Sequence, residues 1–213
     1  MEILYQDNRV LVCLKPAGVL STNEPCGVPE LLRQQLGEER GCVRTVHRLD
    51  RDVGGVMVLA RSREATRLLA AQVRGRGFQK EYLAAVHGAV TPQRGTLRDL
   101  LLRSREEQKT HVVDAPGKDV QEAVLDYKTL CRKDGMSLVS IRLHTGRTHQ
   151  IRCQFASRGL PLVGDRKYGA PGDGCPIALW SHYLSFAHPA TGEMMALRLP
   201  PPGDSFPWTE FNY

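Results

Sequence analysis

Short apolar runs separated by turn residues recur along the chain and predict β-strands. The runs at residues 3–5 and 10–14 flank an Asp-Asn pair, and the second ends in the sequence KPAG, so we predict a hairpin at the N-terminus. Residues 123–130 and 137–143 flank Asp134-Gly135, a pair typical of tight hairpin turns. Further strands are expected at residues 56–60, 82–86, 178–184 and 194–199.

Three segments combine helical spacing with helix-terminal residues. Residues 29–36 begin with proline and are followed by glycine, which suits the first turn and the end of a helix. Residues 63–73 follow Ser62, a candidate N-cap, and their apolar positions fall on one face. In residues 148–157 the expected cap is Thr148, which would place residues 147–152 at a helix N-terminus, where anions bind well.

Residues 91–120 are polar and contain proline and glycine, so we expect long loops or short strands there. Strands outnumber helices, and hairpins replace a regular β-α-β alternation. The pattern therefore indicates an α+β fold with a largely antiparallel sheet. A chain of 213 residues is expected to form a single domain over residues 1–213.

Arginine gives the chain a basic character. The formal net charge is +6, and 22 of the 29 Lys and Arg residues are Arg. Eight arginines and three acidic residues lie between residues 44 and 76. Because guanidinium groups bind phosphate oxygens two at a time, this balance favours a polyanionic partner such as nucleic acid. The alternative is an ordinary solvated basic surface.

The rest of the composition indicates a globular protein of a reducing compartment. Hydrophobic residues make up 41% of the chain and charged residues 24%. The six cysteines include no C-x-x-C pair, which predicts reduced thiols. The N-terminus lacks a signal-peptide pattern, and no uncharged apolar run approaches the ~20 residues of a membrane-spanning helix. We therefore expect a cytoplasmic protein with no membrane partner.

The loop at residues 47–52 is the first candidate site. His47, Arg48 and Arg51 surround Asp50 just before an apolar strand. A nearby cation lowers the pKa of a carboxyl group, so Asp50 would stay ionised and suit nucleophilic or charge-stabilising chemistry. The alternative is an ordinary surface pair of Asp and Arg.

A second polar cluster lies at residues 143–152, where Arg147, His149 and Arg152 follow a glycine at an expected strand-to-helix junction. This composition suits phosphate binding, and the alternative is a polar turn with helix caps. Tyr82 begins an expected strand and is either a core aromatic residue or a stacking partner for a base.

Six motifs together resemble those of the RluA family of pseudouridine synthases, in the family's order and at similar spacing. They are residues 15–18 (KPAG), 47–50 (HRLD) with Gly55, 80–82 (KEY), 144–152 (HTGRTHQIR), 164–165 (GD) with Tyr168 and Gly169, and 186–189 (FAHP) with Thr191 and Gly192. The resemblance spans nearly the whole chain.

The resemblance implies one catalytic domain with a mixed, mainly antiparallel sheet flanked by helices and a central RNA-binding cleft. It implies an RNA pseudouridine synthase that acts on ribosomal or transfer RNA without a cofactor or metal, and a monomer. By the same resemblance, Asp50 attacks or otherwise labilises the nucleoside at C1′, Arg152 pairs with Asp50, and Tyr82 packs on the target base. Arg48 helps to displace the base from its stack, and we expect further RNA contacts from His47, Arg51, Arg147 and His149.

Two differences from relatives of this type stand out. Val53-Gly54 replaces a common Thr-Ser pair after the catalytic aspartate, which removes two hydroxyl groups. We also expect no appended N-terminal RNA-binding domain, because the first motif begins near Met1. Target choice would then rest with the catalytic domain.

Two other functions compete with this interpretation. A non-catalytic RNA-binding protein would share the basic charge, but an acid at position 50 would weaken its binding to a polyanion. A zinc-dependent hydrolase would use the seven His and six Cys residues, yet His144 and His149 are five residues apart and the cysteines lack ligand spacing.

Overall fold

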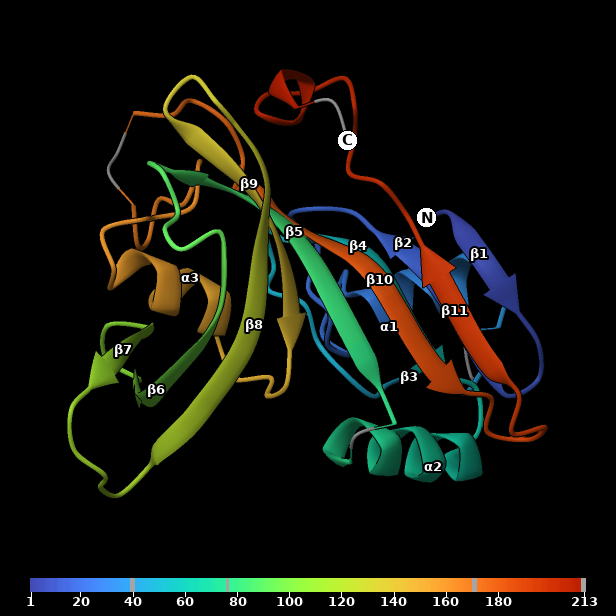
Figure 1. Cartoon of the computed structure of the whole chain (residues 1–213). Helices are drawn as coiled ribbons and strands as arrows, with labels where there is room; N and C mark the ends of the chain where they lie inside the picture. The colour runs from blue at the N-terminus through green and yellow to red at the C-terminus, as the bar shows by residue number, and fades with distance from the viewer. Residues whose placement is uncertain (39–40, 76, 170–171, 212–213) are drawn as a thin grey trace. The chain divides into compact units, whose positions relative to one another are not determined.

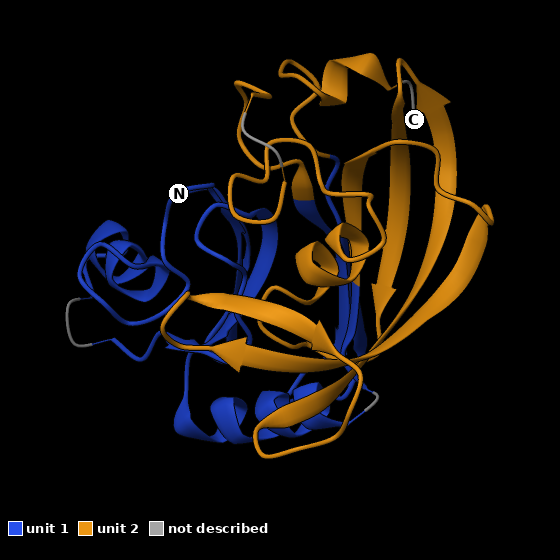
Figure 2. Cartoon of the chain, turned by 90° about the vertical axis from the view of Figure 1, so that its left-hand side faces the viewer, with its two compact units in different colours: residues 1–80, 180–200 blue, residues 81–179, 201–213 orange. Residues whose placement is uncertain are grey.

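The computed structural model describes residues 1–38, 41–75, 77–169 and 172–211 (Figure 1). This described part contains eleven strands, three α-helices and one short 3₁₀-helix, which confirms the α+β prediction. The chain divides into two compact units, residues 1–80 with 180–200 (unit 1) and residues 81–179 with 201–213 (unit 2), coloured separately in Figure 2. Arg76, the last arginine of the basic segment, lies outside the described residues.

Unit 1 is a sheet with two helices. Its strands follow the order β1-β2-β4-β10, with β11 paired to β10 and β3 to β4. All neighbours are antiparallel except β4 and β10. The elements are β1 (Ile3–Gln6), β2 (Val10–Lys15), α1 (Val28–Gln35), β3 (Arg44–Thr45), β4 (Gly54–Ala60), α2 (Arg63–Arg74), β10 (Leu179–Ala187), whose first residue belongs to unit 2, and β11 (Met194–Arg198).

Helix α2 forms where its sequence predicts it. The side chain of Ser62 caps the helix by accepting a hydrogen bond from the Ala65 N–H at 3.0 Å. Ala65 and Leu69 pack into a core with apolar residues of β2, β4 and β10. The arginines at positions 63, 67 and 74 are exposed. One face of α2 therefore secures the sheet while the other carries positive charge.

The start of β4 needs glycine at two successive positions. Gly55 has φ of +122°, and a Cβ atom there would lie 2.3 Å from the Ser181 carbonyl oxygen. A Cβ atom on Gly54 would lie 2.6 Å from Cζ3 of Trp180. A side chain at residue 54 would therefore collide with the ring of Trp180.

In unit 2 the strands are antiparallel and follow the order β5-β9-β8-β6-β7. Asp134 and Gly135 both have positive φ, at 49° and 75°, and make the predicted tight turn between β8 and β9. The elements are β5 (Gln79–His87), whose first two residues belong to unit 1, β6 (Arg94–Ser104), β7 (Lys109–Val113), β8 (Val120–Lys133), β9 (Met136–Leu143), α3 (Gln150–Ala156) and the 3₁₀-helix η1 (Trp208–Glu210).

The prediction of long loops or short strands at residues 91–120 was wrong for β6, an eleven-residue strand. Its backbone pairs with β8 on one side and β7 on the other. Only Leu97 and Leu101 of β6 are buried. The sequence of β6 also lacks the alternation of apolar and polar residues that marks a typical strand. Long-range pairing with β8 outweighs this weak local pattern.

The predicted cap of α3 was also wrong. His149, with φ of 54°, occupies the N-cap position and provides no side-chain cap. This left-handed residue separates Thr148 from the first helical turn, and the Thr148 carbonyl accepts a hydrogen bond from the Thr110 hydroxyl instead. Arg152 is the third residue of α3, so it lies in the first helical turn as predicted, and its side chain is buried.

Candidate active site

The loop that carries Asp50 connects β3 to β4 in unit 1 and is anchored at several residues. Its first anchor is His47, whose Nε2 atom accepts a hydrogen bond from the Val58 N–H at 3.1 Å. Burial, with a smaller contribution from the charge of Lys80, lowers the pKa of His47 to about 3. A neutral imidazole therefore ties the loop to β4, and the RNA contact expected of His47 stays a prediction.

Two further contacts hold the middle of the loop. The Ser21 hydroxyl donates to the Leu49 carbonyl at 2.7 Å and accepts from the Leu49 N–H at 3.1 Å. Arg51 donates from Nε to the Gly18 carbonyl at 3.0 Å, and its own carbonyl accepts from the Gly18 N–H at 2.9 Å. Residues on both sides of Asp50 are thus fixed to the segment that follows β2.

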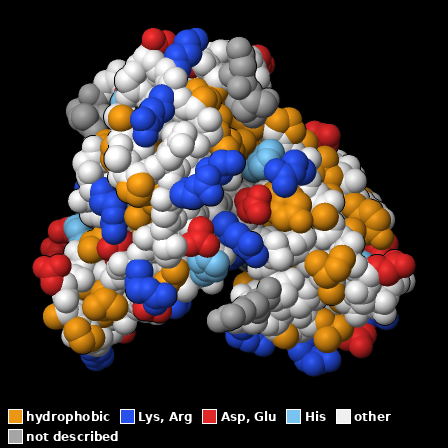
Figure 3. All heavy atoms as spheres, viewed as in Figure 1, with side chains coloured by type: hydrophobic (Ala, Val, Ile, Leu, Met, Phe, Trp, Pro, Cys, Tyr) orange, Lys and Arg blue, Asp and Glu red, His pale blue; other side chains and the backbone are white. Residues whose placement is uncertain are grey.

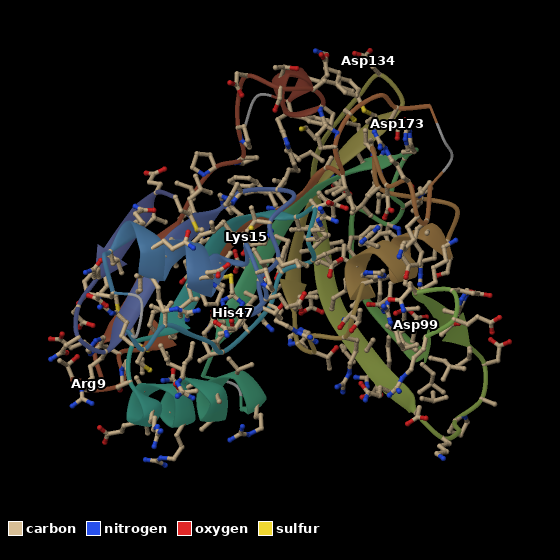
Figure 4. The ribbon with its side chains drawn as sticks, turned by 180° about the vertical axis from the view of Figure 1, so that it is seen from behind. Arg9, Lys15, His47, Asp99, Asp134 and Asp173 are labelled. Carbon is tan, nitrogen blue, oxygen red and sulfur yellow. The ribbon has the colours of Figure 1, made fainter. Side chains whose placement is uncertain are left out.

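Lys15 lies fully buried next to this loop (Figure 4). Its Nζ atom donates to the carbonyls of Arg51 at 2.9 Å, Val53 at 2.8 Å and Pro16 at 3.0 Å. Burial lowers the pKa of Lys15 to about 8, while the nearby charges of Asp52 and Asp50 act in the opposite direction. The ammonium group therefore both holds the loop and adds positive charge close to Asp50.

Replacing Lys15 with Met should destabilise unit 1 and misplace Asp50. The carbonyls of Val53, Arg51 and Pro16 lose their shared donor, and we expect a loss of about 2–3 kcal/mol in the free energy of unfolding. Thermal unfolding together with hydrogen exchange of the backbone amides at residues 47–52 checks this prediction. A variant with both unchanged would show that Lys15 does not hold the loop.

Asp50 itself is half-buried, whereas Arg48, Arg51 and Asp52 are exposed. The Asp50 carbonyl accepts a hydrogen bond from the Val53 N–H at 3.1 Å, which closes the turn before β4. The loop thus presents a carboxylate from a fixed backbone, among cations and within reach of solvent. Such a group can attack an electrophilic carbon without first reorganising the loop.

Unit 2 carries the other predicted site residues. Arg152 lies in α3 and forms two hydrogen bonds with Asp165, from Nε to Oδ2 and from Nη2 to Oδ1, both at 2.8 Å. Tyr82 is a buried residue of β5. Arg147 is exposed and donates from Nε to the Glu122 carbonyl at 2.9 Å, and His149 contacts the Tyr168 hydroxyl through Nδ1 at 2.9 Å.

Asp165 received no role in the sequence analysis, where it appears only within the Gly-Asp motif at residues 164–165. Its side chain is almost fully buried. Burial alone would raise the pKa of Asp165, but the hydrogen bonds and charge of Arg152 outweigh it and lower the pKa below its usual range. The signal that was available is an acid at the end of the apolar run 160–164, where an ionised group needs a partner.

The predicted residues thus divide between the units. Unit 1 holds His47, Arg48, Asp50 and Arg51 on one loop, and unit 2 holds Tyr82, Arg147, His149 and Arg152. That Asp50 meets Tyr82 and Arg152 stays a prediction.

Three further findings concern metal binding, membrane binding and the cysteines. Among the described residues, no group of three or more His, Cys, Asp or Glu side chains lies close enough to hold a metal ion. No helix in the described ranges is long and apolar enough to cross a membrane. All six cysteines are free thiols.

The sequence matches one family model and several relatives, and their names all refer to RNA pseudouridine synthases. Residues 9–157 match the family model described as RNA pseudouridylate synthase. An uncharacterised RNA pseudouridine synthase of Bacillus subtilis, YhcT, is 34% identical over 216 residues, which cover 96% of this chain and 70% of the relative. Ribosomal large subunit pseudouridine synthase D of Pseudomonas aeruginosa is 35% identical over 230 residues, covering 98% and 70%.

A solved structure supports the fold. Human RNA pseudouridylate synthase domain containing 1 superposes with a TM-score of 0.80 at 24% identity, over 94% of this chain and 83% of that one.

Proposed function

The chain belongs to the RNA pseudouridylate synthase family, and on this premise we propose that it converts uridine to pseudouridine in ribosomal RNA with Asp50 as the nucleophile. The observation that carries the proposal is the family match over residues 9–157, which includes the anchored loop with its half-buried carboxylate. The same match favours an enzyme over a non-catalytic RNA-binding protein.

The reaction needs no net change in atoms or electrons. The Asp50 carboxylate attacks C1′ as the bond from C1′ to N1 of uracil breaks, and the uracil leaves with that electron pair. The base turns so that C5 bonds to C1′ and displaces Asp50. C5 then loses its proton and N1 gains one. Pseudouridine has the same composition as uridine, so the reaction consumes no co-substrate.

Roles for the other residues follow from their chemistry. Arg152 would stabilise the Asp50 carboxylate, and Tyr82 offers a flat face for the base and a hydroxyl that can assist proton removal from C5. Arg48 would help to extrude the uridine, because C1′ is inaccessible in a stacked helix. His47, Arg51, Arg147 and His149 would contact the RNA.

The names of two relatives support a ribosomal substrate. The relative from Pseudomonas aeruginosa carries a name that refers to the large ribosomal subunit, as does pseudouridine synthase C of Salmonella typhimurium, which is 35% identical over 211 residues. Lys and Arg side chains reach the surface among neutral and acidic groups (Figure 3), which suits contacts with phosphates.

We further propose that the two units form one catalytic domain with an RNA cleft, and that the protein is a cytoplasmic monomer.

Mapping the modified uridines tests this proposal. The purified protein is incubated with in vitro transcribed large-subunit ribosomal RNA and, separately, with transfer RNA transcripts, and pseudouridines are located by chemical labelling and primer extension. We expect new pseudouridine at one or a few positions of the ribosomal RNA. Modification of transfer RNA alone would overturn the ribosomal assignment, and modification of neither would overturn the activity.

A further inference from the structure

The segment of residues 164–169 forms a tightly closed turn in unit 2. Gly164 has φ of +74°, and a Cβ atom there would lie 2.2 Å from the Pro176 carbonyl oxygen. The Gly169 N–H donates to the Asp165 carbonyl at 2.7 Å, and a Cβ atom on Gly169 would lie 2.8 Å from the same oxygen. Both glycines therefore allow close backbone contacts that fix Asp165 and Tyr168.

Asp165 controls the direction in which Arg152 points. Its two oxygens bind the Nε and Nη2 atoms, so the side edge of the guanidinium is held at two points. The Lys167 and Tyr168 N–H groups donate to Oδ1 of Asp165 at 3.0 and 3.1 Å, which fixes the carboxylate itself.

Tyr168 controls the plane of the same guanidinium group. The Cζ atom of Arg152 lies 5.2 Å from the centroid of the Tyr168 ring, within the range of a cation–π contact. The Tyr168 hydroxyl accepts a hydrogen bond from the Thr110 N–H at 2.7 Å and lies 2.9 Å from Nδ1 of His149. The ring is thus tied to β7 and to the start of α3.

We propose that Asp165 and Tyr168 are positioning residues for the isomerisation, because together they fix the direction and the plane of the Arg152 guanidinium that acts on Asp50. This inference rests on the proposed function and on the role of Arg152 within it. Stability alone gives a weak reason for this pair, since buried pairs add little compared with apolar packing. Placing a guanidinium group for catalysis, in contrast, requires that its direction be fixed, and the two-point contact with Asp165 does this.

Helix α3 provides a matched control. Arg158, two residues beyond the end of the helix, donates from Nη1 and Nη2 to Asp99 at 2.9 and 3.0 Å, so a second Asp–Arg pair ties the segment that follows α3 to β6. Asp99 has no place in the proposed site. Asp99→Asn therefore reproduces the loss of one helix-anchoring carboxylate without touching Arg152.

The experiment compares Asp165→Asn, Tyr168→Phe and Asp99→Asn on in vitro transcribed large-subunit ribosomal RNA. Asparagine keeps an oxygen for the Lys167 and Tyr168 N–H groups but loses one of the two acceptors for Arg152. We expect kcat to fall about 10–100-fold for Asp165→Asn with KM within about threefold of wild type. Tyr168→Phe keeps the ring and should lower kcat by about 3–10-fold, and Asp99→Asn should stay within about twofold.

A spectroscopic measurement tests the clamp without activity. In ¹⁵N-labelled protein, the Nε–H signal of Arg152, assigned by its loss in Arg152→Lys, should exchange with solvent at least about tenfold faster in Asp165→Asn than in wild type. If wild type is active and Asp165→Asn keeps its kcat, or if exchange is unchanged, the inference is overturned and the function stands. If wild type is inactive on every RNA, the proposed function fails, and the exchange rates alone decide whether Asp165 holds Arg152.

Discussion

Replacing Asp50 with asparagine should abolish pseudouridine formation, with a fall in the single-turnover rate on the order of 10⁴-fold or more. Asparagine has nearly the same size, so the anchored loop keeps its shape. Its amide oxygen is a poor nucleophile, however, and the bond to C1′ does not form. Because Asp50 is only half-buried, we expect its substitution to leave the thermal unfolding midpoint within a few degrees of wild type.

Release of tritium from RNA that contains [5-³H]uridine measures this effect, because the C5 hydrogen is lost when the new glycosidic bond forms. Asp52→Asn is the matched control, since Asp52 lies in the same loop and is exposed. We expect it to retain most of the activity. A rate for Asp50→Asn within about tenfold of wild type would assign the nucleophile to another residue.

Replacing Arg152 with Met should have the largest effect on stability. It leaves the carboxylate of Asp165, which is 1% exposed, buried without its cation. Breaking such a pair costs about 3–5 kcal/mol, which corresponds to a fall of roughly 6–20 °C in the unfolding midpoint. We also expect loss of pseudouridine formation, because Asp50 loses the cation proposed to stabilise it.

The destabilisation should depend on pH with a definite sign. In wild type, Arg152 lowers the pKa of Asp165, so this pair stabilises the fold above the unfolded-state pKa of the carboxyl group, about 4, and the stability is lost at lower pH. In Arg152→Met the two contributions of Arg152 that lower the pKa of Asp165 are lost, while burial still acts to raise it. The difference in stability between the two proteins should therefore be largest near neutral pH and shrink below about pH 4.

A second substitution separates stability from activity. Asp165→Asn in the Arg152→Met background removes the unpaired charge and should recover most of the lost unfolding free energy without restoring pseudouridine formation. Urea unfolding and tritium release on the same preparations check both parts. A double variant as unstable as Arg152→Met would contradict the buried-charge explanation.

Local sequence patterns predicted most of the fold because the relevant interactions are short in range. Ser62 caps α2 through a residue three positions away, and Asp134 and Gly135 make their turn with their own backbone. Strand β6 was missed because its burial is limited to Leu97 and Leu101 and its stability comes from pairing with β8. Its register depends on residues that lie 18 to 34 positions away, which a local pattern does not contain.

The site residues, too, were predicted where neighbours in the sequence form the site and missed where the contacts are long in range. Asp50 and its neighbouring arginines were evident in the sequence because they are adjacent. Lys15 was noted only within a turn motif, since its carbonyl partners on Arg51 and Val53 lie 36 and 38 residues away. The pairing of Asp165 with Arg152 was missed because the two residues are 13 positions apart and a local pattern does not show their contact. Supporting contacts of this kind require the three-dimensional structure.

Nucleoside analysis of RNA treated with the wild-type protein tests the central claim most directly. Large-subunit ribosomal RNA, transcribed in vitro so that it contains only uridine, is incubated with the protein, digested to nucleosides and separated by liquid chromatography with mass detection, while RNA binding is measured in parallel. The account predicts a new nucleoside with the mass of uridine and the retention time of pseudouridine. RNA that is bound by the protein but yields only uridine would contradict it and identify a non-catalytic RNA-binding protein.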